Sequence, residues 1–372
     1  MPLIVTTAVG STPVAHIKLH GAGEMDRILC VGDLSSELIW NREEEEISLA
    51  PGEEGFQFSI DTRQTNTGLN SPVPNTFSIP TSGNGGNTAT EYNWFIDWGD
   101  GLMEYKSGTS GTTAGDGGVG IPHTYATPGE YLITIKPADD RDAWFRAFGF
   151  WTTNTAGTAN TAANRQKVVS PLTPLTVKMF ASDGSTDLSL VNDVCRIMFY
   201  GCNGVGFTLG DNFGFDDGWD SVVSVGDSFC NNMFNSCSSL TSLPSSFNLP
   251  VGITTVGANF CSNMFASCHS LTALPSLFNP PTKIATAGAF FCYRMFFDCG
   301  SLVVNADFRF PLLPQLVTGP TVAFSQTFCT CTKAQTVHAL TIINGNPAPS
   351  SARQTFNGSF PDYASLPANW KQ

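Results

Sequence analysis

The chain is poor in charged residues. Only 13% of its 372 residues are Asp, Glu, Lys or Arg, which is roughly half the share of an ordinary soluble domain. The 18 basic side chains are outnumbered by 31 acidic ones and form no cluster. Because a formal charge of -13 would be repelled by a phosphate backbone, we expect no nucleic-acid partner.

Long apolar runs are lacking as well. No stretch reaches the ~18 apolar residues of a membrane-spanning helix, so we expect no membrane insertion. The first residues, MPLIVTTAVGSTPVAHIKLHGAG, contain no basic region, apolar core or cleavage site of a secretory signal. The sequence as it stands therefore predicts a soluble protein without a secretory signal of its own.

Turn-forming and small polar residues are abundant instead, which predicts a mainly β fold of two or three domains. Residues 1–55 suggest a small β-rich module that could serve as an anchor. Its acidic run, Glu43 to Glu46, allows cation binding, but no calcium-type loop accompanies it and a solvated loop is favoured. Residues 138–176 are expected to be a linker, first aromatic and buried (AWFRAFGFW), then polar.

Residues 56–137 alternate apolar and polar positions with a strand period of two, which predicts a β-sandwich. WFIDWGDG followed by HTYATPGEYLITI resembles the polycystic-kidney-disease (PKD) type of immunoglobulin-like domain. The matching residues are Trp98, Gly99, Asp100, Gly101, His123, Thr124, Tyr125, Gly129 and Tyr131. The resemblance implies turn and core roles for them, with glycines at positive φ and Asp100 closing its turn.

This region allows one catalytic and one phosphate-binding interpretation beside the structural ones. Asp97, Asp100 and His123 could form an acid, a base and an orienting group, but no nucleophile motif lies near them. The glycine-rich insertion, Lys106 to Gly120, lacks the Lys-Ser/Thr ending and following helix of a phosphate-binding loop. We therefore expect structural turns and a surface loop.

From about residue 177 to 372 the chain repeats itself. The unit FCNNMFNSC recurs with spacings of 35, 31, 31 and 32 residues, counted on its second cysteine, and its last copy is degenerate. A fixed period of this size is typical of a solenoid, whose units bury their apolar faces by stacking. The repeated positions are Cys195, Met198, Phe199, Cys202, Cys230, Met233, Phe234, Cys237, Cys261, Met264, Phe265, Cys268, Cys292, Met295, Phe296 and Cys299.

Within one unit, Phe229, Met233 and Phe234 have helical spacing and predict a short helix. Leu240 and Leu243 are spaced as in a short strand or extended bend. The unit resembles the leucine-rich repeats of bacterial surface antigens (BspA-like). That resemblance implies a solenoid with short helices, and a PKD-like domain followed by such repeats is a recurrent arrangement in bacterial and phage surface proteins.

The eleven cysteines allow four interpretations. Pairs separated by six residues do not fit the spacing of a zinc site, so no metal or cofactor is expected. A catalytic thiol is disfavoured because His269 follows Cys268 in one unit only. Disulfides within or between units remain open, since the rung spacing is compatible with bridging. Buried free thiols, one column led by Cys230 and another by Cys237, are the favoured interpretation.

No part of the chain is left over for a catalytic domain, so we expect a protein that is not an enzyme. The favoured hypothesis is a virion surface or structural protein, a phage head or tail appendage, located in the virion. Its partners would be other virion or surface proteins, a homo-oligomer, or a host-surface protein or glycan. The alternatives are a BspA-like adhesin on the extracellular surface of a bacterial cell and the accessory modules of a glycan-active protein.

Overall fold

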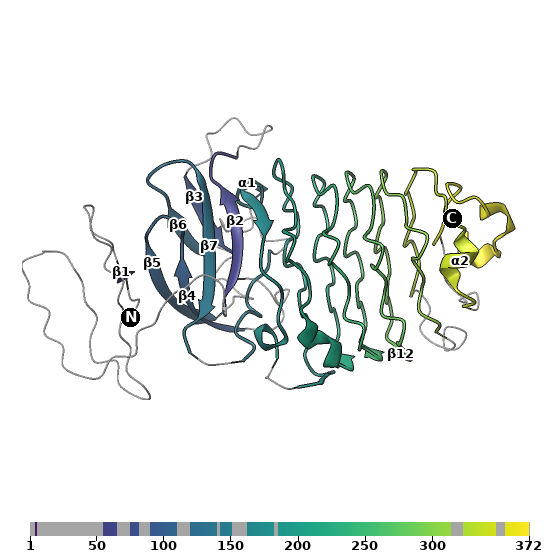
Figure 1. Cartoon of the computed structure of the whole chain (residues 1–372), viewed down its shortest axis with the longest axis horizontal. Coiled ribbons are helices and arrows are strands. Elements are labelled where there is room, and N and C mark those ends of the chain that lie inside the picture. Colours follow the sequence, from purple (N-terminus) through teal and green to yellow (C-terminus); the bar gives the residue numbers. More distant parts are fainter. Residues whose placement is uncertain are drawn as a thin grey trace, which may run out of the picture.

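The fold is mainly β, as expected. The computed structural model describes residues 4–5, 55–64, 75–81, 90–109, 120–139, 142–150, 162–181, 185–313, 323–346 and 354–371. Within these ranges three sheets hold nearly all strands, and the two α-helices, α1 (Ala162–Arg165) and α2 (Ala339–Ile343), are short. Figure 1 shows packed sheets followed by a row of side-by-side turns, with the C-terminus near the far end of the row.

The first part consists of two antiparallel sheets. A six-stranded sheet has the order β1-β5-β4-β7-β2-β8, and a two-stranded sheet pairs β3 with β6. Burial alternates along β2, as the period-two pattern predicts. The rings of Phe58 in β2 and Phe77 in β3 lie 5.9 Å apart, so the two sheets face each other across a shared core. The strands are β1 (Ile4–Val5), β2 (Phe56–Asp61), β3 (Thr76–Ile79), β4 (Glu91–Asp97), β5 (Met103–Thr109), β6 (Ile121–Thr124), β7 (Glu130–Pro137) and β8 (Val168–Pro171).

Two of the expected boundaries change. Strand β8 lies in the region expected to be a linker, yet it pairs with β2 as an edge strand of the large sheet. Strand β1 pairs with β5 at the other edge of the same sheet. The remainder of 1–54, including the Glu43 to Glu46 run, and 110–119 of the glycine-rich insertion lie outside the described residues. The sheet therefore draws strands from both flanks of 56–137.

The aromatic half of the expected linker is buried between the sheets and the turns, as predicted. Phe145 and Phe148 are at most 3% exposed. The Phe145 ring lies 4.6 Å from that of Phe56 in β2, and the Phe148 ring lies 5.9 Å from that of Phe199 in the first turn of the row. This segment joins the two parts through one apolar core.

The second part is a stack of turns that we call rungs. Each rung buries most of its apolar side chains inside the stack. The first three rungs each return through a short parallel strand, and these three strands and β9, which precedes the first rung, form a sheet of order β12-β11-β10-β9. The rungs are residues 193–227 (rung 1), 228–258 (rung 2), 259–289 (rung 3), 290–313 (rung 4) and 323–346 (rung 5), and 354–371 form the cap. The strands are β9 (Asp187–Leu188), β10 (Ser224–Val225), β11 (Thr255–Val256) and β12 (Thr286–Ala287). Four 3-10 helices, η1 (Val177–Met179), η2 (Asp217–Ser221), η4 (Tyr363–Ser365) and η5 (Ala368–Trp370), complete the described elements.

Backbone hydrogen bonds link each rung to the next. The Phe234 N–H donates to the Met264 carbonyl at 2.9 Å, and the Phe265 N–H donates to the Met295 carbonyl at 2.9 Å. The Asn232 N–H also donates to the next rung, to the Ser262 carbonyl at 2.9 Å, whereas the Met233 N–H between Asn232 and Phe234 donates locally to the Cys230 carbonyl at 3.2 Å. Alternating donors in this way satisfies the buried backbone inside a narrow stack.

The prediction of a short helix at Phe229 to Phe234 was wrong. This segment is a series of overlapping turns with positive φ at Cys230 (54°) and Asn232 (57°). Type II turns require positive φ at their third position, whereas an α-helix needs negative φ and bonds to residue i−4. Apolar spacing of i, i+4 and i+5 therefore arises here without a helix. Leu240 and Leu243, expected in a short strand or an extended bend, lie in a segment without regular secondary structure, and the regular strand of this rung is Thr255–Val256.

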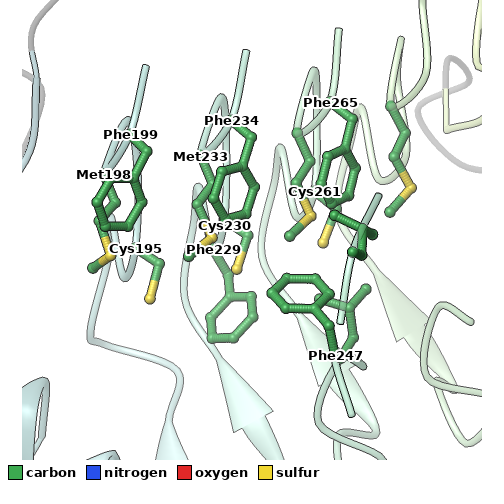
Figure 2. Packing of buried hydrophobic residues seen from close by; sticks show 14 of the residues in the cluster. Cys195, Met198, Phe199, Phe229, Cys230, Met233, Phe234, Phe247, Cys261 and Phe265 are labelled. Atoms are coloured by element: carbon green, nitrogen blue, oxygen red, sulfur yellow. The ribbon is translucent and has the colours of Figure 1, made fainter. Parts of the chain in front are cut away.

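Phenylalanine rings form columns through the stack (Figure 2). In the main column the rings of Phe199, Phe234, Phe265, Phe296 and Phe328 are separated by 5.4 to 5.8 Å, with neighbouring planes at 10° or less. Such near-parallel, offset pairs each contribute about 0.5–1.5 kcal/mol beyond the burial of their area. The columns explain why the aromatic positions of the repeat keep one period.

Both ends of the main column are covered by aromatic side chains. At one end Phe56 of β2 lies 6.3 Å from Phe199, and at the other Phe356 of the cap lies 5.6 Å from Phe328. Trp370 in η5 packs 6.2 Å from Phe356 and is 1% exposed. Terminal rungs would otherwise expose their apolar faces to water, so the sheets and the cap act as the two ends of the stack.

Candidate functional site

The structure brings the PKD-like residues together at the β4–β5 turn and the neighbouring strands β6 and β7. The Asp97 carboxylate accepts from the Gly99 N–H at 2.9 Å, and the Asp100 carboxylate accepts from the Leu102 N–H at 3.1 Å. Gly99 has φ of 79° and Gly101 has φ of 90°. The positive φ predicted for Gly99 and Gly101 and the turn-closing role predicted for Asp100 are confirmed.

Aromatic side chains back this turn. The His123 ring stacks on the Trp98 indole at 4.6 Å and meets the Tyr125 ring edge-on at 4.5 Å. The Tyr125 ring in turn stacks on Tyr131 at 3.9 Å. Trp98 and Tyr125 are at most 2% exposed, and their polar tips are satisfied by Glu104 Oε2 at 2.9 Å and the Trp98 carbonyl at 3.1 Å.

The electrostatics of this cluster are those of a structural site. His123 Nε2 lies 2.8 Å from Asp100 Oδ2. Burial raises the pKa of the Tyr125 hydroxyl, and the negative charge of Asp100 raises it further, so Tyr125 remains a neutral donor. Gly129 holds the next turn, where its N–H donates to Thr62 Oγ1 at 2.9 Å.

The catalytic interpretation of Asp97, Asp100 and His123 gains no geometric support. Asp97 accepts from backbone, and Asp100 divides its oxygens between backbone and His123. Within the described ranges, no hydroxyl or thiol forms a hydrogen bond with His123 that could be activated as a nucleophile. The pair therefore fixes the turn against β6.

The sixteen repeat residues singled out in the sequence all face the interior of the stack, and none is more than 3% exposed. Figure 2 shows Cys195, Cys230 and Cys261 on successive rungs, with the methionines and phenylalanines in register beside them. All described cysteines are free thiols. Cys30 lies outside the described residues.

From the second unit onward, the second cysteine of the unit has a specific partner in the preceding rung. The Cys268 thiol donates to the Phe234 carbonyl of the preceding rung at 3.2 Å, and the Cys299 thiol donates to the Phe265 carbonyl at 3.0 Å. Cys237 and its later counterparts thus add a side-chain bond between rungs where the backbone lacks one. This role was missed from the sequence, because burial alone does not tell which acceptor a thiol meets.

Burial also sets the chemistry of these thiols. The pKa values of Cys230, Cys237, Cys268 and Cys292 are raised well above their usual range, because the apolar interior disfavours the thiolate. A thiol that stays protonated donates a hydrogen bond and is a poor nucleophile or metal ligand. These four thiols are therefore suited to holding the rungs in register and poorly suited to nucleophilic attack.

His269 does not form the thiol–histidine pair considered for Cys268. Its Nε2 atom instead lies 2.9 Å from Asp298 Oδ2 of the next rung, with both side chains about half exposed. Among the described residues no group of three or more His, Cys, Asp or Glu side chains could hold a metal ion. No helix in the described ranges is long and apolar enough to cross a membrane.

The outer edge of the rungs is the remaining candidate surface. In rung 2 its side chains are neutral and bonded to one another: Asn235 Nδ2 donates to Asn232 Oδ1 at 2.8 Å, and Ser236 Oγ donates to Asn235 Oδ1 at 2.8 Å. In rung 4 the same edge carries Tyr293, Arg294 and Phe297, which sequence analysis did not single out. Superposing the units residue by residue could have found this difference.

Comparison of the chain with known proteins found no match to any family model, any curated protein sequence or any solved structure.

Proposed function

We propose that the chain is a non-enzymatic structural protein of a virion surface, in which a PKD-like sandwich carries a BspA-like leucine-rich-repeat solenoid. In this role it is a head or tail appendage, fibre or decoration that contributes to assembly and to adhesion at a host surface. The observation that carries the proposal is the continuous apolar core, which runs from Phe56 of the sheets through all five rungs to Trp370 of the cap.

A core of this kind suits a mechanical role. Rung-to-rung backbone bonds, ring columns and thiol bonds all act along the same axis, so the stack resists bending and separation of its rungs. Figure 1 shows the elongated outline that results. An elongated body with largely neutral flanks can pack beside neighbours or project from a particle.

The polar groups of the described region also support a non-enzymatic role. The His123–Asp100 pair closes a turn, the Cys268 thiol donates to a backbone carbonyl, and the Asn side chains at the outer edge of rung 2 form hydrogen bonds with one another. An acyl-transfer or hydrolytic site needs an activated nucleophile or a pair of positioned carboxylates instead. The structural use of these groups favours assembly and adhesion over catalysis.

The proposal is tested in cells that carry the gene. We expect mass spectrometry of purified particles to detect this chain in fixed ratio to the major particle protein, and neighbouring genes to encode capsid or tail proteins. Particles that lack the chain, together with a leader peptide encoded upstream, would favour the cell-surface adhesin. Glycan hydrolysis by the purified chain that is lost on replacing one acidic residue would contradict the non-enzymatic role.

A further inference from the structure

Rung 4 differs from its neighbours along the outer edge of the stack. We call the side chains of Tyr293, Arg294, Phe297 and Asp298 the rung-4 patch. The backbone bonds place these residues in register with rung 3, since the Asn263 N–H donates to the Tyr293 carbonyl at 2.8 Å. The equivalent side chains are small in the two preceding rungs. They are Asn231, Asn232, Asn235 and Ser236 in rung 2, and Ser262, Asn263, Ala266 and Ser267 in rung 3.

The side chain of Arg294 is held in place within the rung-4 patch. Its guanidinium carbon lies 5.0 Å from the centre of the Tyr293 ring and 4.8 Å from that of Phe297. Arg294 Nε donates to Gln326 Oε1 of rung 5, which also accepts from the Tyr293 hydroxyl at 3.2 Å. Gln326 Nε2 donates to Gln354 Oε1 at 2.6 Å. A guanidinium fixed in this way loses little conformational entropy when it binds a carboxylate.

The rung-4 patch also carries charges of both signs. Asp298 follows Phe297 directly, and its side chain remains 44% exposed although it meets His269. Among the described residues Arg294 has no ion pair. The patch therefore adds no net charge to a chain whose formal charge is -13, and it escapes the repulsion that opposes contact elsewhere.

The composition of the rung-4 patch is that of an interface centre. Tyr, Phe and Arg are enriched at the cores of protein contacts, while Lys and Glu are depleted there. Phe290, which is 39% exposed, extends the apolar area and meets the Tyr293 ring at 5.4 Å. The small neutral side chains of rungs 2 and 3 allow a partner to approach without burying further charge.

We propose that the rung-4 patch binds a second copy of this chain about a twofold axis. The patch carries one cation, Arg294, against the Phe297 ring, and one anion, Asp298, at the next residue, so the patch of one copy can be complementary to that of another. Under twofold symmetry a contact made by one copy is made again by the other. Arg294 of each copy meets Asp298 of the other, and the two Phe297 rings lie near the axis. This proposal rests on the assembly role in the proposed function, and it identifies the surface through which two copies of the chain assemble.

Charge exchange at these two positions provides the test. Sedimentation equilibrium of the full chain, up to about 1 mM, detects even weak specific association. We expect a reversible dimer that added salt weakens. The single variants Arg294→Asp and Asp298→Arg should each weaken dimerisation at least about tenfold, because like charges then face each other twice. The double variant Arg294→Asp/Asp298→Arg should restore the dimer, as should an equimolar mixture of the single variants.

The matched control is Asp211→Arg, which makes the same charge reversal as Asp298→Arg on an exposed side chain of rung 1 and should leave dimerisation unchanged. Near-ultraviolet circular dichroism verifies that each variant is folded. A chain that stays monomeric throughout, or a double variant that remains as weak as the singles, overturns the proposal. Dimerisation by a chain that is never found in a particle would support this contact while contradicting the proposed function, and a monomeric chain found in particles would do the reverse.

Discussion

Removing the ring of Phe265 should open a cavity in the centre of the main column. Phe265 is fully buried and lies between Phe234, at 5.4 Å, and Phe296, at 5.6 Å. Replacing a buried Phe by Ala costs about 3–5 kcal/mol. Because two stacked ring pairs are lost as well, and each contributes roughly 0.5–1.5 kcal/mol, we expect Phe265→Ala to lie at the upper end, about 4–5 kcal/mol.

The matched control for this cavity is Phe290→Ala in the next rung. Phe290 is 39% exposed and has a single ring neighbour, Tyr293, at 5.4 Å. Its loss should cost about 1 kcal/mol, mainly from that one ring contact. Urea unfolding followed by circular dichroism measures both free energies of unfolding. Equal costs for the two variants, or a cost below about 2 kcal/mol for Phe265→Ala, would refute the ring-column account.

Three further predictions concern the thiols, one turn and one buried lysine. In a Cys30→Ser background the described thiols should resist a thiol reagent at pH 8 until denaturant is added, because burial disfavours thiolates; rapid labelling of the native chain would contradict this. Gly99→Ala should destabilise the chain more than Gly206→Ala. Both glycines have φ of 79°, but a Cβ on Gly99 would lie 2.4 Å from the Leu132 carbonyl oxygen, and one on Gly206 would meet nothing within 4 Å. Equal losses of melting temperature in the two variants would show that the close approach of the Leu132 carbonyl to Gly99 does not affect stability. Burial lowers the pKa of Lys167 to about 8, so between pH 8 and the unfolded value of 10.5 the unfolded chain binds more protons and stability rises with pH. The free energy of unfolding of wild type should therefore rise relative to that of Lys167→Met as pH rises through this window, and a constant difference would be inconsistent with the lowered pKa.

The sequence predicted which side chains lie inside the stack better than it predicted the conformation of the backbone. A fixed period placed Met233, Phe234 and Cys237 on the inside, because stacking leaves equivalent residues in equivalent surroundings. The same spacing suggested a helix, and this was wrong. Positive φ at Cys230 and Asn232 accompanies hydrogen bonds to the neighbouring rungs, from the Cys230 N–H to the Val194 carbonyl of rung 1 and from the Asn232 N–H to the Ser262 carbonyl of rung 3. No local pattern in one unit reveals these bonds.

Long-range pairing explains the other differences. Strand β8 lies in the segment expected to be a linker from its small and polar composition, and the place of the strand is fixed by pairing with β2 more than a hundred residues earlier. The turn at Gly99 was predictable because its signals are local: an Asp on each side and a glycine at positive φ. The direction in which Arg294 points depends on the rung geometry and could be recognised only from the structure.

The most direct test of the central claim is the protein composition of purified particles from cells that carry the gene. Quantitative mass spectrometry and cryo-electron microscopy of the same preparation would measure both the copy number and the position of the chain. The account predicts a fixed copy number and density on the particle surface that fits the sheets and the stacked rungs. Particles that repeatedly contain neither the chain nor such density would contradict it.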